Sequence, residues 1–170
     1  MGCGYKRGEY MRRWNGWGDD TVLYHLPASA GQFLYDRIGA GTPPVEASLK
    51  EVVSRAPASR LPDHPLVSLN EQDRTLHARG QSLPDWLALR YGSVDSFPDG
   101  VAFPLVAEDV RELLRYARQA GAKVIPYGGG TSVVGHINPL LGDDPVLTVD
   151  LSRMNRLVRL DETGLLATFE

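Results

Sequence analysis

Residues 126–135 read Pro-Tyr-Gly-Gly-Gly-Thr-Ser-Val-Val-Gly, directly after the short apolar run Lys123-Val124-Ile125. Three consecutive glycines are costly in conformational entropy, and structural turns rarely need so many. Without Cβ atoms, backbone N–H groups can crowd around an anion, and the hydroxyls of Thr131 and Ser132 add donors beside them. The pattern favours a loop that binds phosphate or pyrophosphate; a glycine-rich structural turn is the alternative.

Two better-known phosphate-binding motifs do not fit this stretch. A P-loop requires a lysine after its second glycine, and no lysine follows here. The dinucleotide-binding fingerprint G-x-G-x-x-G, counted from Gly128 and Gly130, would need a glycine where Val133 stands. A helix should also follow that fingerprint, whereas residues 135–145 predict an open loop.

The segments before the loop predict a β-α-β unit. Residues 101–103 form an apolar run ended by Pro104, and residues 107–120 have helical periodicity that Gly121 should end. The strand 123–125 follows, and the length of the crossover fits a parallel pair of strands. The apolar face of the helix is predicted to consist of Val110, Leu113, Leu114 and Ala117.

The segments after the loop predict three more strands, at 146–151, 157–160 and 165–169. The last two are joined by residues 161–164, Asp-Glu-Thr-Gly, which have hairpin turn chemistry. Because the final strand reaches the last residue, we expect the fold to continue beyond it. The fold class predicted is α+β.

Residues 1–97 predict short helices joined by loops. One apolar stretch around Phe33–Ile38 should stop at Gly39, and a helix should begin at Thr42-Pro43-Pro44 and bury Val45, Leu49, Val52 and Val53. Another should run from Ser82 to Tyr91 and stop at Gly92, burying Leu83, Trp86, Leu87 and Leu89.

Composition excludes several classes of function. The net charge of −3 gives no basic footprint for nucleic acid, and no apolar run approaches the ~20 residues that a membrane span needs. Trp14 and Trp17 therefore predict packing rather than base stacking, against a part of the protein outside this chain. We expect the charged residues around Lys6, Arg7, Arg12 and Arg13 to be solvated. The single cysteine, Cys3, permits no internal disulfide, which fits a cytoplasmic location.

The ordered set of motifs resembles a known family. The run Pro98-Asp99-Gly100-Val101-Ala102-Phe103-Pro104, the helix, and the stretch 124–132 resemble the FAD-binding domain of the vanillyl-alcohol oxidase type, also called PCMH-type. Residues 13–19 (Arg-Trp-Asn-Gly-Trp-Gly-Asp), 77–82 (His-Ala-Arg-Gly-Gln-Ser) and 150–156 (Asp-Leu-Ser-Arg-Met-Asn-Arg) resemble alkyldihydroxyacetonephosphate synthases and their bacterial relatives.

The resemblance implies an incomplete flavin domain at 98–170, preceded by a helical extension at 1–97. It implies that backbone amides of the loop hold the pyrophosphate of FAD, with the matching residues Pro126, Tyr127, Gly128, Gly129, Gly130, Thr131, Ser132 and Gly135. Some relatives attach the flavin through a histidine after the glycines; Thr131 stands there, so the FAD is expected to be non-covalent. His136 stands where many relatives have glycine, and we expect no covalent role for it.

The resemblance implies a flavin-dependent oxidoreductase or synthase whose substrate, a small molecule or lipid-like compound, would bind a cap domain outside this chain. We expect no catalytic residue within the 170 residues, because the sequence offers no nucleophile–base arrangement. We also expect no metal ligand, because His25, His64 and His77 lack metal spacing. The alternative is an inactive flavin-domain segment that serves as a binding module. Exposed apolar surface and sheet edges predict that the isolated chain self-associates, for example as a homo-oligomer, or is poorly soluble.

Overall fold

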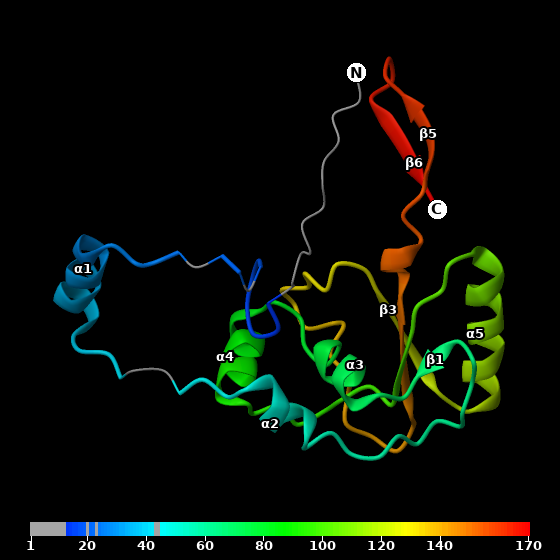
Figure 1. The fold of residues 1–170 in the computed structure, drawn as a ribbon, viewed down its shortest axis with the longest axis horizontal. Helices are drawn as coiled ribbons and strands as arrows, with labels where there is room; N and C mark the ends of the chain where they lie inside the picture. The colour runs from blue at the N-terminus through cyan, green and yellow to red at the C-terminus, as the bar shows by residue number, and fades with distance from the viewer. Residues whose placement is uncertain (1–12, 20, 23, 43–44) are drawn as a thin grey trace.

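The structure is a computed structural model that describes residues 13–19, 21–22, 24–42 and 45–170. It has an α+β fold (Figure 1). Its helices are α1 (Ala28–Ile38), α2 (Leu49–Val53), α3 (Glu71–Leu76), α4 (Leu83–Tyr91), α5 (Ala107–Gln119) and the 3-10 turn η1 (Leu151–Arg153). Its strands are β1 (Val67–Ser68), β2 (Gly100–Ala102), β3 (Lys123–Tyr127), β4 (Val146–Asp150), β5 (Leu157–Asp161) and β6 (Leu166–Phe169).

Four strands form the central sheet in the order β1-β2-β4-β3. Strand β4 is parallel to both β2 and β3, while β1 is antiparallel to β2. The predicted β-α-β unit is present, but the expected direct pairing of its two strands is wrong, because β4 lies between them. All five residues of β4 are buried, as a central strand of a covered parallel sheet requires. Pro126, which cannot donate to a ladder, lies in β3 at the edge.

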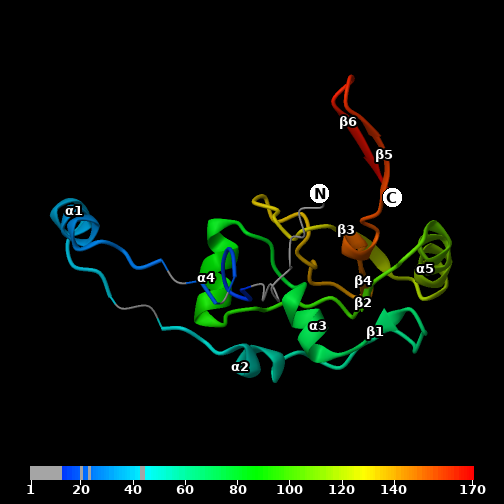
Figure 2. The same cartoon turned by 45° about the horizontal axis from the view of Figure 1, so that its top comes forward.

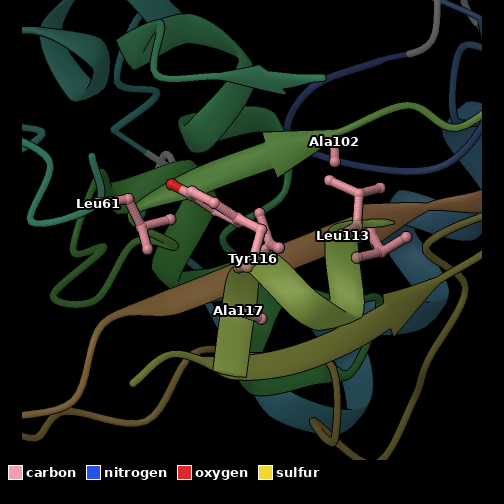
Figure 3. Packing of buried hydrophobic residues seen from close by; sticks show 7 residues of the cluster. Leu61, Ala102, Leu113, Tyr116 and Ala117 are labelled. Atoms are coloured by element: carbon pink, nitrogen blue, oxygen red, sulfur yellow. The ribbon is translucent and has the colours of Figure 1, made fainter. Parts of the chain in front are cut away.

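Helix α5 covers one face of the sheet and α3 and α4 lie on the other (Figure 2). Leu113, Tyr116 and Ala117 of α5 pack against Ala102, Leu147, Val149 and Leu61 (Figure 3). The predicted helix is confirmed, but Leu114 is 52% exposed instead of buried. Tyr116 takes its place on the buried face, since its hydroxyl reaches the carbonyl oxygen of Pro62 at 2.6 Å.

A second cluster of buried side chains, Val52, Ala78, Leu89 and Val94, lies beside α4, and Trp14 packs against it. The expectation that Trp14 packs outside this chain is therefore wrong. Helix α4 begins and ends where predicted, with Ser82 and Asp85 forming a capping box and Gly92 in the left-handed region. Of its predicted core residues only Leu89 is buried, whereas Leu83 and Leu87 are exposed.

The N-terminal helices differ from the prediction in their packing. Helix α2 begins at Leu49, because Ser48 and Glu51 form a reciprocal capping box there, and Val45 is 68% exposed. Pro43 and Pro44 lie outside the described residues, as do Cys3, Lys6, Arg7 and Arg12. Helix α1 ends at Gly39 as predicted but has no buried residue, and it stands apart from the sheet (Figure 1).

The predicted C-terminal hairpin is confirmed: β5 and β6 pair antiparallel, and the amide of Gly164 binds the Oδ1 of Asp161 at 2.9 Å. It projects from the body of the fold beyond η1 (Figure 1). Every residue of β6 is exposed, including Leu166 and Phe169. Among the described residues, none of the helices has the length and apolar character needed to span a bilayer.

Candidate functional site

A cavity of about 630 Å³ lies where β2, β3 and β4 end. The carboxyl ends of parallel strands are where ligands of open α/β sheets commonly bind. The wall combines segments that are far apart in the sequence, including Trp17, His77, Phe103, Gly128, Thr131 and Asp150. The fold thus brings the motifs at residues 13–19 and 77–82 next to the glycine-rich loop.

The glycines of the loop serve two different purposes. Gly130 and Gly135 have φ angles of 68° and 75°, a region that glycine adopts without strain. Gly128 and Gly129 have no such requirement. Among the described residues, a Cβ at Gly128 would meet nothing within 4 Å, and one at Gly129 only the Thr131 methyl carbon at 3.6 Å. Packing of the chain therefore does not explain these two glycines, whereas an incoming ligand would.

The backbone amides of the loop are available for a ligand. Within residues 13–19, 21–22, 24–42 and 45–170, no group accepts a hydrogen bond from the N–H of Gly129, Gly130 or Thr131. Both Gly129 and Thr131 line the large cavity. Adjacent free amides without intervening side chains form a concave site for an anion.

The 77–82 motif holds the end of the loop in place. The amide of Gln81 donates to the carbonyl oxygen of Ser132 at 2.6 Å. The amide of Gly80 donates to the Oδ1 of Asn138 at 3.0 Å, and the Nδ2 of Asn138 donates to the Oδ1 of Asp85 at 2.6 Å. The buried Asp85 also caps α4, so the loop is fixed to the start of that helix. Sequence reasoning missed this contact, although the lone Gly80 within the motif was a signal of close backbone approach.

The remaining predicted site residues lie on both sides of the loop. Tyr127 is buried at the end of β3. A second hollow, of about 430 Å³, is lined by Pro126, Ser132 and His136 among others. The Ser132 hydroxyl lies 3.5 Å from the Nδ1 of His136. Gly135 lies in the following turn, where its carbonyl accepts from the amide of Asn138 at 3.0 Å.

His77 is hydrogen-bonded to Asp150 in the cavity wall. Its Nε2 lies 2.9 Å from the Oδ2 of Asp150, and its Nδ1 lies 2.7 Å from the carbonyl oxygen of Asp73. Burial by itself raises the pKa of Asp150, but hydrogen bonds from His77 and from the amide of Ser152 outweigh it and lower that pKa. His77 is thus a satisfied buried residue, whereas His25 is exposed and His64 lies near Glu112.

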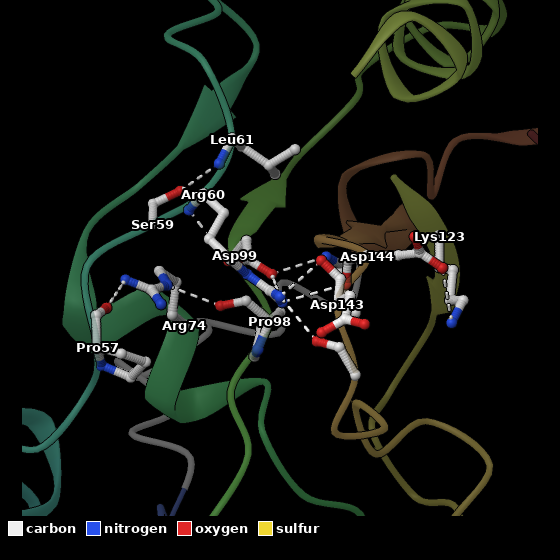
Figure 4. A network of polar contacts seen from close by, with 12 residues as sticks. Pro57, Ser59, Arg60, Leu61, Arg74, Pro98, Asp99, Lys123, Asp143 and Asp144 are labelled. Atoms are coloured by element: carbon white, nitrogen blue, oxygen red, sulfur yellow. Dashed lines mark hydrogen bonds and ion pairs between the residues drawn. The ribbon is translucent and has the colours of Figure 1, made fainter. Parts of the chain in front are cut away.

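A polar clamp fixes the opposite end of β4 (Figure 4). The guanidinium of Arg60 donates to both carboxylate oxygens of the buried Asp99 at 2.8 Å, and it also binds the carbonyl oxygens of residues 142–144. Asp99 accepts a further bond from the amide of Val146, where β4 begins. Burial of Asp99 raises its pKa, but these hydrogen bonds outweigh it and the pKa is lowered. The clamp therefore sets the position of the strand that ends at the cavity.

Comparison with known proteins gives the site a family context. Residues 98–170 match the family described as FAD binding domain. The chain is 31% identical over 120 residues to the alkyldihydroxyacetonephosphate synthase of Dictyostelium discoideum, covering 71% of this chain and 19% of that protein. It is 37% identical over 75 residues to the mitochondrial D-lactate dehydrogenase [cytochrome] 1 of Saccharomyces cerevisiae, covering 43% and 12%.

Solved structures agree on the fold. A structure of alkyldihydroxyacetonephosphate synthase superposes with a TM-score of 0.71 at 22% identity, over 93% of this chain and 36% of that chain. This chain therefore spans about a fifth or less of the curated relatives above. Within that span, residues 98–170 match the FAD binding domain family, and the chain is similar to alkyldihydroxyacetonephosphate synthases.

Proposed function

We propose that this chain supplies the pyrophosphate-binding part of a non-covalent FAD site in a flavin-dependent enzyme. The observation that carries the proposal is the set of free amides at Gly129, Gly130 and Thr131, on a loop whose glycines leave open space toward the cavity. The loop residues would be 126–132 with Gly135. Thr131 and Ser132 offer hydroxyl donors but no nitrogen for a covalent flavin link, and His136 lines the hollow on the other side.

The family context supports FAD over other phosphate-bearing ligands, because residues 98–170 match an FAD binding domain. When bound, the flavin would supply the electron chemistry of the enzyme, while the protein supplies orientation and a shaped cavity. This chain's residues would bind the diphosphate, exclude water with Trp17 and Phe103, and fix the loop through Gln81 and Asn138. No catalytic residue is assigned to them.

For the whole protein we propose a synthase-like enzyme over a dehydrogenase. The motifs at residues 13–19 and 77–82, which precede the FAD binding domain match, line the same cavity through Trp17 and His77. The substrate, small or lipid-like, would bind parts of the protein outside this chain. A binding module that has lost its activity is the second candidate, favoured by the β5–β6 hairpin, whose residues other than Asp161 are exposed and could form a surface for another polypeptide.

The proposal is tested by titrating the chain with FAD and with inorganic pyrophosphate, followed by calorimetry and flavin fluorescence. The informative variants are Gly128→Ala and Gly129→Ala, because the added Cβ meets open space and leaves the fold intact. Gly142→Ala is the matched control: its Cβ also meets nothing within 4 Å, but Gly142 lies outside the large cavity.

We expect saturable binding of both ligands, weakened about tenfold or more by either loop variant, since each lost hydrogen bond to a charged group has an effect of this order. Gly142→Ala should bind like the unaltered chain. The melting temperature should be the same for the unaltered chain and its three variants. Equal FAD affinity in all four, or no binding of FAD and pyrophosphate at millimolar concentration, would contradict the proposal.

A further inference from the structure

His77 lies at the junction of the three strand ends that form the cavity. It follows the last turn of α3 and is buried. Its ring centroid lies 4.5 Å from that of Tyr127, the residue directly before the glycines, and 5.7 Å from that of Phe103, the residue directly after β2. Its Nε2 binds Asp150, the last residue of β4, which is in register with Tyr127. One side chain thus contacts the ends of β2, β3 and β4.

Both hydrogen-bond partners of the ring are oxygen atoms that accept. The carbonyl oxygen of Asp73 can only accept, so the Nδ1 of His77 carries a hydrogen. The Asp150 carboxylate is ionised and also only accepts, since its Oδ1 already takes the amide hydrogen of Ser152 at 2.8 Å. The Nε2 faces this carboxylate, so the form of the ring that can donate to both partners is the one with a hydrogen on each nitrogen.

Other charged groups around the ring have separate partners. The Asp73 carboxylate accepts from the Ser68 hydroxyl at 2.5 Å. Arg74 points to the carbonyl oxygens of Pro57 and Pro98. The Arg153 guanidinium after β4 lies 4.8 Å from the centre of the Phe103 ring. On β3 the facing group is the aromatic ring of Tyr127. Asp150 is therefore the counter-ion of His77.

We propose that the cationic form of His77, paired with Asp150, is a positioning residue of the cofactor site: it fixes the end of β3 and hence the place where the glycine-rich loop begins. The inference rests on the proposed FAD site. When the ring loses its proton, the Nε2 lone pair faces the carboxylate and the hydrogen bond is lost. The loop then starts from a less defined position, and its free amides no longer converge on one anion.

Asp150→Asn separates charge from hydrogen bonding. The amide oxygen of the asparagine can still accept from Ser152, and its NH₂ group can donate to the Nε2 of a neutral histidine ring. The variant retains each hydrogen bond and removes both charges. His64→Gln is the matched control, because His64 also faces a carboxylate, that of Glu112 at 3.4 Å, but does not line the cavity.

Two measurements are made on the full chain from about pH 6 upward, the range in which histidine side chains lose their charge. Nitrogen NMR of the His77 ring and the amide shifts of Gly128–Gly130 need no ligand. FAD affinity is measured over the same range. We expect both ring nitrogens of His77 to be protonated at the lowest pH. The amide shifts of the glycines should change as one of these protons is lost. The FAD affinity should fall about tenfold or more over the same pH range.

In Asp150→Asn the ring should carry one proton throughout, and both the glycine shifts and the FAD affinity should be independent of pH. His64→Gln should behave like the unaltered chain. Glycine shifts that ignore the His77 proton, or a variant that keeps the full pH dependence, would overturn the inference. Glycine shifts that follow the proton in a chain that binds no FAD would support the positioning role and contradict the proposed cofactor site instead.

Discussion

Gly80 lies against the backbone of Ser132: a Cβ added at Gly80 would be 2.5 Å from the Ser132 carbonyl oxygen. The same oxygen accepts the hydrogen bond from Gln81 at 2.6 Å. Gly80→Ala should therefore push the loop away from α4, destabilise the fold by about 2 kcal/mol and weaken FAD binding. Urea unfolding and FAD titration measure the two effects.

The control for Gly80→Ala is Gly31→Ala in α1, where a Cβ meets nothing within 4 Å. That variant should be neutral or slightly stabilising, because alanine has the higher helix propensity. A Gly80→Ala protein as stable as the unaltered chain would show that the loop can shift without cost.

Leu113 and Leu114 are neighbours in α5 with opposite environments, 0% and 52% exposed. Leu113→Ala should destabilise the protein by about 2–5 kcal/mol, because it leaves a cavity against Ala102 and Leu147. Leu114→Ala should change the free energy of unfolding by under about 1 kcal/mol. Chemical denaturation of both variants tests which face of α5 is buried, and equal losses would contradict the packing described.

Asp99 should make the fold sensitive to acid. Its pKa is lowered in the folded protein from the ordinary value of 3.8, so its contribution to stability is fully present above that pH. The contribution is lost as the pH falls below 3.8 and through the folded value. Asp99→Asn should lower stability at neutral pH by about 2 kcal/mol. The difference in unfolding free energy between the variant and the unaltered chain should shrink as the pH falls below 3.8. Urea midpoints measured over this range test the prediction, and a difference that does not change with pH would contradict it.

Thr148, at the centre of β4, has a buried hydroxyl without a hydrogen-bond partner among the described residues. An unsatisfied buried hydroxyl costs about 1–3 kcal/mol, and valine has nearly the same shape. Thr148→Val should therefore raise the free energy of unfolding by about 1 kcal/mol. A lower melting temperature for this variant would indicate that the hydroxyl has a partner after all.

The features that the sequence predicted well depend on neighbouring residues. Helix α4 begins next to Ser82, Gly92 ends it, and Gly121 follows α5, because helix starts and stops depend on a few adjacent residues. The hairpin turn at residues 161–164 is local in the same sense. The glycine-rich loop was recognised from its composition, and its free amides agree with that interpretation, although its ligand stays a prediction.

The features that could not be predicted from the sequence depend on contacts between distant residues. The residues around Val146 do not indicate that β4 lies between β2 and β3. The strand order depends on the burial of all five residues of β4, which involves contacts with distant segments. The predicted buried face of α5 included Leu114 and omitted Tyr116, whose hydroxyl has a partner at the carbonyl oxygen of Pro62. His77 and Asp150 each lie in a recognised motif, but their pairing was not predicted, because they are 73 residues apart in the sequence.

The cavity wall has a consequence for the order of events during biosynthesis. It contains Trp17 near one end of the chain and Asp150 near the other, and β4, which carries Asp150, joins β2 to β3. A nascent chain therefore has no cavity until the segment beyond the loop has left the ribosome, although the glycines emerge earlier. Contacts of such long range form late in folding. We therefore expect the cofactor to bind only after this segment has been translated. A shortage of cofactor would then lower the occupancy of the folded site and would not slow formation of the sheet.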